Sequence, residues 1–69
     1  MKHNHRFIFR YDGELGQVIR ACRPGDAERY ARQLARAIAE KYTAADVVCV
    51  WHGPAESKLP KKLLAEASA

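Results

Sequence analysis

The segment DAERYARQLARAIAEKY, residues 26–42, decides the fold of this 69-residue chain. Its larger apolar side chains recur every four residues: Tyr30, Leu34, Ile38 and Tyr42. With alanines between them, they form one stripe on an α-helix, and the charged residues fall on the other side. Asp26 stands at the N-cap position, where its carboxylate is expected to accept hydrogen bonds from the first backbone N–H groups. The segment predicts one amphipathic helix, with Leu34 and Ile38 as its central contacts.

Residues 5–11 precede the helix and alternate along an extended chain. Phe7, Phe9 and Tyr11 lie on one side, which is typical of a half-buried strand with an aromatic inner face. The alternation predicts that this face packs against the helix.

Asp12-Gly13 favours a type I′ turn into a second strand, because that turn needs positive φ at both central positions. Gly16 lies close by and leaves the register open, and a slip of one residue moves every side chain to the other face. With the tight turn, the residues on the aromatic face are Val18 and Cys22. With a three-residue loop, they are Leu15, Ile19 and Ala21.

Residues 46–52 follow the helix and contain five consecutive apolar side chains, at 47–51. A run without alternation is typical of a strand that is covered on both faces. Gly53-Pro54 ends this strand, and Ser57 is a candidate cap for a short helix over residues 58–66. The apolar side chains of that helix would be Leu59, Leu63 and Leu64.

These elements predict an α+β fold in the order ββαβ, with a three-stranded sheet packed on one amphipathic helix. Residues 1–69 are expected to form a single small domain. Within it, residues 1–4 form a flexible N-terminus, residues 5–53 the core, and residues 54–69 a C-terminal tail or short helix. A chain of this size buries only about 60% of the surface that its unfolded form exposes, so its stability is expected to be marginal.

One helix covers only one face of such a sheet, and the third strand carries apolar side chains on the other. That second face needs a cover. We expect a homodimer to supply it, and the alternative is that the C-terminal tail folds back and supplies the cover.

The chain contains twelve Lys and Arg against eight Asp and Glu, a formal net charge of +4. A basic chain favours acidic partners, such as an acidic protein or ribonucleoprotein surface, or nucleic acid. Two cysteines are too few for a disulfide framework, and no apolar run is long enough for a signal peptide or a membrane span. The sequence therefore predicts a cytoplasmic protein that does not bind membranes.

Residues that carry chemistry are scattered. His3, His5, Cys22, Cys49 and His52 are the potential metal ligands. Cys49 and His52 are three apart on a predicted strand and should point to opposite faces, so no metal site and no cofactor are expected. The cysteines are expected to be core residues rather than thiolates. No nucleophile motif or phosphate loop accompanies them, and the sequence predicts that the protein is not an enzyme.

The arginines are the candidate partner-binding residues. Arg29, Arg32 and Arg36 share the outer face of the predicted helix, and Arg6 and Arg10 share the outer face of the first strand. The guanidinium fork suits phosphates and carboxylates. The alternative is a solvated face, in which Glu28–Arg32 and Arg36–Glu40 pair at i,i+4.

From Phe7 to Trp51, the hairpin–helix–strand order resembles the small domain of HicB-type antitoxins. It is also similar to small phage-borne anti-CRISPR proteins, which inhibit bacterial immunity. The resemblance is one of architecture and assigns no residue roles. It implies a mobile-element protein that works by occupying a surface.

The first hypothesis is therefore a non-enzymatic binding protein that occludes a protein or ribonucleoprotein surface, with an inhibitor of CRISPR immunity as its concrete form. The second is a basic nucleic-acid-binding or antitoxin-like module.

Overall fold

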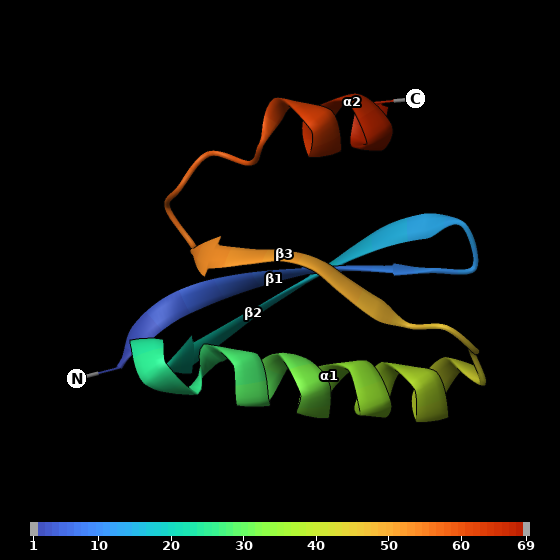
Figure 1. The fold of residues 1–69 in the computed structure, drawn as a ribbon, viewed down its shortest axis with the longest axis horizontal. Helices are drawn as coiled ribbons and strands as arrows, with labels where there is room; N and C mark the ends of the chain where they lie inside the picture. The colour runs from blue at the N-terminus through green and yellow to red at the C-terminus, as the bar shows by residue number, and fades with distance from the viewer. Residues whose placement is uncertain (1, 69) are drawn as a thin grey trace.

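The computed structural model describes residues 2–68, with side chains to Glu66. A three-stranded antiparallel sheet lies between two helices, and its strand order is β2-β1-β3 (Figure 1). The elements are β1 His3–Tyr11, β2 Glu14–Cys22, a 3-10 turn Pro24–Asp26, α1 Ala27–Tyr42, β3 Val48–Pro54 and α2 Lys61–Ser68. The predicted α+β fold, with its ββαβ order and a short C-terminal helix, is confirmed.

The hairpin between β1 and β2 adopts the tight-turn register. Asp12 and Gly13 have φ of 52° and 76°, as a type I′ turn requires. Tyr11 pairs with Glu14, and the ladder continues without a break to His3 and Cys22. Residues 3 and 4, expected in a flexible terminus, therefore belong to β1.

β3 pairs with the other side of β1, which makes β1 the central strand. The strand runs two residues later than the predicted 46–52 at each end. Its register shifts between Ile8 and Phe9, because Ile8 pairs with Trp51 and Phe9 with Cys49, leaving Val50 as a bulge. The apolar run therefore contains the bulged Val50 and also Val48, which is 54% exposed.

The helix α1 matches the predicted range, but its N-terminal cap differs. Asp26 occupies the N-cap position in a helical conformation, and its side chain makes no capping hydrogen bond. The preceding 3-10 turn already directs the Asp26 N–H to the Arg23 carbonyl oxygen at 2.9 Å. At the other end Thr43 takes a left-handed conformation with φ of 52°, and this ends the helix.

The main core lies between α1 and the aromatic face of the sheet. Phe7 and Phe9 are fully buried and stack with ring centroids 6.4 Å apart. On the helix the buried residues are Ala27 and Ala31. The expectation that Leu34 and Ile38 make the central contacts is wrong, because both are only half-buried. The buried residues of α1 therefore lie in its N-terminal half.

The second face of the sheet is covered by the chain itself. Ile8 is 4% exposed and Leu63 of α2 is 7% exposed. Both line a small cavity together with Leu59, which precedes the helix. The C-terminal tail thus folds back over the second face of the sheet, which a second copy of the chain would otherwise have to cover.

The helix α2 begins at Lys61, three residues later than predicted, and Ser57 does not cap it. Pro60 precedes the first turn, and its carbonyl oxygen accepts hydrogen bonds from Leu63 and Leu64 at 3.0 and 3.1 Å. The residue before a proline is disfavoured in the helical region, so Leu59 stays outside the helix.

Candidate functional site

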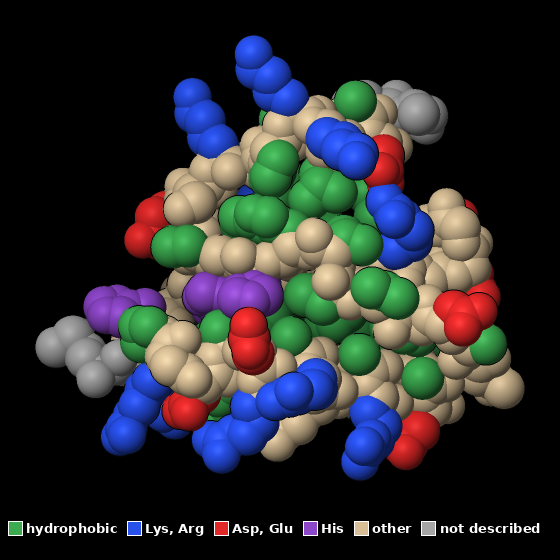
Figure 2. All heavy atoms as spheres, in the orientation of Figure 1, with side chains coloured by type: hydrophobic (Ala, Val, Ile, Leu, Met, Phe, Trp, Pro, Cys, Tyr) green, Lys and Arg blue, Asp and Glu red, His purple; other side chains and the backbone are tan. Residues whose placement is uncertain are grey.

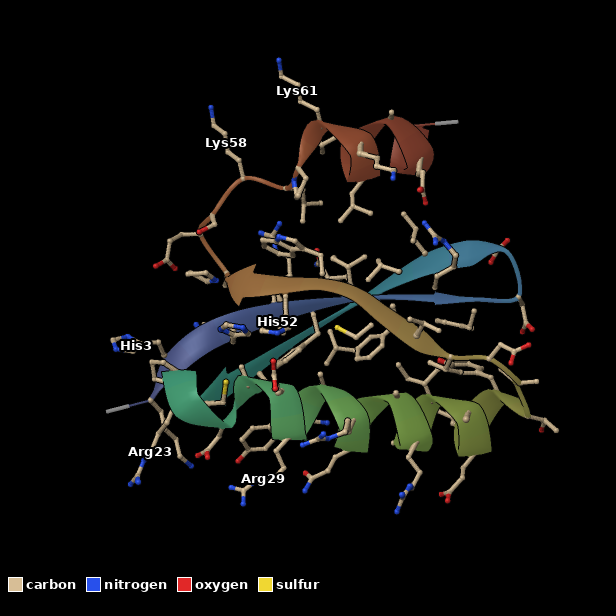
Figure 3. The ribbon with its side chains drawn as sticks, viewed as in Figure 1. His3, Arg23, Arg29, His52, Lys58 and Lys61 are labelled. Atoms are coloured by element: carbon tan, nitrogen blue, oxygen red, sulfur yellow. The ribbon has the colours of Figure 1, made fainter. Side chains whose placement is uncertain are left out.

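Three predicted site residues, Arg29, Arg32 and Arg36, form a row along the outer face of α1. All three are exposed, and Figure 3 shows Arg29 pointing away from the sheet. They line a shallow hollow of about 370 Å³ together with Gln33, Ala37 and Glu40. The three guanidinium groups thus border one concave surface.

Ion pairing inside the row is limited. Arg29 Nη2 lies 3.3 Å from Asp26 Oδ1. Within residues 2–66, neither Glu28–Arg32 nor Arg36–Glu40 forms a salt bridge, so the pairs expected for a solvated face are not made. Two of the three guanidinium groups therefore keep their donors available to a ligand.

Arg6 and Arg10 are placed differently. Arg6 is half-buried, its Nη2 donates a hydrogen bond to the Ala55 carbonyl oxygen, and its buried Nε has no partner among the described residues. Arg10 Nη2 lies 2.7 and 2.6 Å from the two carboxylate oxygens of Glu66. These two arginines attach the C-terminal segment to β1. The structure therefore does not bring the five predicted arginines together.

Basic side chains gather on both outer layers of the molecule, around α1 and around α2, with apolar side chains between them (Figure 2). Lys58 and Lys61 point into solvent on the α2 side, away from Arg23 and Arg29 on the α1 side (Figure 3). The α2 layer thus offers lysines, and the α1 layer offers arginines.

A histidine pair that the sequence did not predict lies where β1 and β3 meet. His5 Nε2 and His52 Nδ1 are 3.0 Å apart, so one ring donates a hydrogen bond to the other. Burial, and secondarily the charge of His52, lower the pKa of His5. The pairing depends on the β1–β3 register, which has no local signature in the sequence.

The bulge at Val50 also corrects the prediction for Cys49 and His52. Both lie on the face that packs against α1, rather than on opposite faces, because the bulge inserts one residue between them. Even so, within the part of the chain that the structure describes, no group of three His, Cys, Asp or Glu side chains is arranged to hold a metal ion.

The two cysteines sit in or beside the core. Cys22 is buried, and Cys49 is half-buried with its thiol donating a hydrogen bond to the Trp51 carbonyl oxygen at 3.4 Å. Burial raises the pKa of the Cys49 thiol. The neutral thiol is therefore favoured at Cys49, and the thiolate that a nucleophile needs is disfavoured.

Comparison with known proteins gives no relative: no protein family, no curated protein and no solved structure matches this chain. Neither helix within residues 2–68 combines the length and apolar character that crossing a membrane would require.

Proposed function

We propose that this protein is a non-enzymatic binding protein that acts in the cytoplasm by occluding an acidic protein or ribonucleoprotein surface. Its concrete form is an inhibitor of bacterial CRISPR immunity carried by a phage or another mobile element. The concrete form draws on the resemblance of residues 7–51 to small anti-CRISPR proteins.

The observation that carries the proposal is the arginine row on α1. Arg29, Arg32 and Arg36 border one concave surface, and two of them have no salt bridge within the described residues. The close packing of Ala27 and Ala31 against the sheet holds the helix in place. A rigid element fixes the spacing of binding side chains better than a loop does.

A plasmid-interference assay tests the concrete form. Bacteria with an active CRISPR system express either the intact protein or a variant in which Arg29, Arg32 and Arg36 are all alanine. The intact protein should restore transformation by a targeted plasmid, and the triple variant should not. Circular dichroism should show that the variant keeps its fold, because the row lies off the buried stripe.

The matched control replaces Lys58, Lys61 and Lys62 by alanine, since these residues carry the same charge on the α2 side. This control should inhibit as well as the intact chain does. Full inhibition by the arginine variant would show that the row is only a solvated face. No inhibition by the intact chain, in cells with type I or type II systems, would reject the concrete form.

The second candidate is direct nucleic-acid or antitoxin-like binding through the same row, which the basic charge of the chain favours. Salt dependence separates the two. A protein that contacts three phosphates of a DNA duplex loses affinity with a log–log slope of roughly −3, because each contact contributes about −0.9. Titration of a labelled duplex in rising salt gives the slope, and each Arg→Ala change should reduce its magnitude by about one.

A further inference from the structure

We propose that the free edge of β2 and the groove beside it form a docking site for an extended, acidic peptide segment of a partner protein. The segment would add a strand to the sheet and place alternate side chains between β2 and α1. This deepens the proposed function, because it rests on the protein acting as a binder and names a second surface and its ligand.

The first observation is an open sheet edge. β2 is an outer strand, its nine residues pair with β1 without a register shift, and it contains no proline. The other outer strand, β3, carries the bulge at Val50 and ends at Pro54. Bulges and prolines discourage pairing at an edge, so β2 is the better acceptor of a further strand.

The hairpin register fixes which backbone groups are available. In a two-residue hairpin the pair next to the turn exchanges both hydrogen bonds, and bonded and non-bonded pairs then alternate. The residues of β2 whose N–H and C=O groups point outward are therefore Leu15, Gln17, Ile19 and Ala21. Within residues 2–68, no backbone hydrogen bond joins these groups to another segment.

The second observation is a groove of about 240 Å³ between β2 and the C-terminal half of α1. Val18 on the strand and Leu34 and Ile38 on the helix supply its apolar lining. Leu34 and Ile38 are half-buried, whereas the buried residues of α1 lie in its N-terminal half. A peptide strand at the β2 edge would direct every second side chain toward this opening.

The third observation is the charge of the groove. Arg20 from β2 and Lys41 from α1 line it, and no carboxylate does so among the described residues. Both side chains are exposed. An acidic segment is thus favoured, because its carboxylates would lie beside these two cations. A second copy of β2 carries one carboxylate, Glu14, and is the alternative occupant that light scattering tests.

The experiment selects ligands from a displayed library of random nine-residue peptides, using the full chain. The selected peptides should be enriched in Asp and Glu and should alternate apolar side chains. A labelled peptide from the selection is then titrated against the intact chain and its variants. On binding, the amide hydrogen exchange of Gln17 and Ile19 should slow.

Two variants with matched controls locate the site. Ile19→Pro removes one outward N–H, with Ile19→Ala as its control. Arg20→Glu with Lys41→Glu reverses the charge of the groove, with Lys61→Glu and Lys62→Glu giving the same change in net charge on the α2 side. We expect the peptide affinity to fall at least tenfold in the first member of each comparison and to stay within about twofold in its control. The charge pair decides the question if Ile19→Pro fails to fold.

Recovery of no acidic peptide, or equal binding to both charge variants, would overturn the proposal. So would an intact chain that is a dimer in light scattering and that Ile19→Pro converts to a monomer. Alanine at Arg29, Arg32 and Arg36 should leave peptide affinity unchanged, and loss of affinity in that variant would move the site to the arginine row. The interference assay tests the arginine row, and the peptide titration tests the groove beside β2. Each proposal can therefore fail without the other.

Discussion

Phe7 and Phe9 point from β1 toward α1, whereas Ile8 between them points toward α2. The first face is closed by a 16-residue helix over two fully buried aromatic rings. The second is closed by an 8-residue helix, two leucines and an ion pair between Arg10 and Glu66. The central strand therefore contributes to two apolar layers of unequal size. The α1 face carries most of the stability, and the α2 face acts as a cover.

Phe9→Ala should have the largest effect, because it removes a fully buried ring from the stronger face. Loss of about 3–5 kcal/mol is typical for such a change, and a domain of this length has roughly 3–10 kcal/mol in all. Urea denaturation followed by circular dichroism measures it. Ile19→Ala, at a side chain that is 49% exposed, is the control. Equal midpoints for the two variants would contradict the assignment of this core.

Ending the chain at Pro54 should have the next largest effect. It uncovers Ile8 and removes Leu59 and Leu63. Leu63 is buried and corresponds to about 1.5–3 kcal/mol, and Leu59 is half-buried and contributes less, so we expect a loss of about 2–4 kcal/mol. We expect the truncated chain to remain folded around α1 and to dimerise through the uncovered face, and the full chain to be monomeric.

Light scattering and thermal melts of both lengths check this. Leu63→Ser in the full chain should reproduce part of the loss, and Leu64→Ser, at a side chain that is 48% exposed, should not. A truncated chain that is monomeric and as stable as the full chain would show that the tail is not the cover. The structure does not test the homodimer that the sequence led us to expect. The tail covers the face that was the reason for expecting it, and we therefore expect the full chain to be monomeric.

A Gly→Ala substitution on each face should have a smaller effect on stability and compares the packing of the two faces directly. A Cβ at Gly53 would lie 2.7 Å from the Trp51 ring on the α2 face, and one at Gly16 would lie 3.0 Å from the Tyr11 ring on the α1 face. Gly53→Ala should destabilise the protein by about 1–3 kcal/mol, and Gly16→Ala by less. Gly25→Ala is the control, because no atom lies within 4 Å of its Cβ position. The reverse order in thermal melts would contradict the closer packing at Trp51.

The ion pair across the α2 face should contribute little. Arg10 and Glu66 are 47% and 36% exposed, and exposed pairs contribute about 0.2–1 kcal/mol. A double-mutant cycle with alanine at both positions measures the coupling, which should shrink in high salt. A coupling energy above this range that does not change with salt concentration would contradict the assignment of this ion pair as exposed.

The smallest expected effect is on the dependence of stability on pH. The pKa of His5 is below its ordinary value of 6.5 in the folded protein, so the unfolded chain binds more protons. Stability is therefore fully present above about pH 6.5 and decreases as the pH falls below it. We expect the Tm to fall between about pH 8 and pH 5.5. His5→Gln should flatten this profile, and an unchanged profile would show that burial of His5 is not the source of the pH dependence.

The sequence predicted the parts of the fold that depend on local pattern. The α1 range follows from helical periodicity, and the Asp12-Gly13 turn follows from the need for positive φ. The late start of α2 and the bulge at Val50 were missed, because Pro60 and the β1–β3 register override local propensity. Gly16 and Gly53 lie within β2 and β3, where the fold places an aromatic ring beside each of them.

For the candidate site, the arginine row was predictable because helical spacing alone places Arg29, Arg32 and Arg36 together. The hydrogen bonds of Arg6 and Arg10 could not be predicted, because their partners Ala55 and Glu66 lie about 50 residues away in the chain. The groove beside β2 could not be predicted from the sequence either. It depends on how the C-terminal half of α1 packs beside β2, which no local pattern determines.

The central position of β1 has a consequence for how the chain folds. The hairpin with β2 is local, because its strands are joined by two residues. Pairing with β3 joins residues near His5 to residues near Pro54, which must close a loop of most of the chain. Such non-local pairings are the slow steps in small α+β domains. During synthesis, one edge of β1 therefore stays unpaired until β3 has been synthesised. In that interval it is most open to aggregation or to capture by a chaperone.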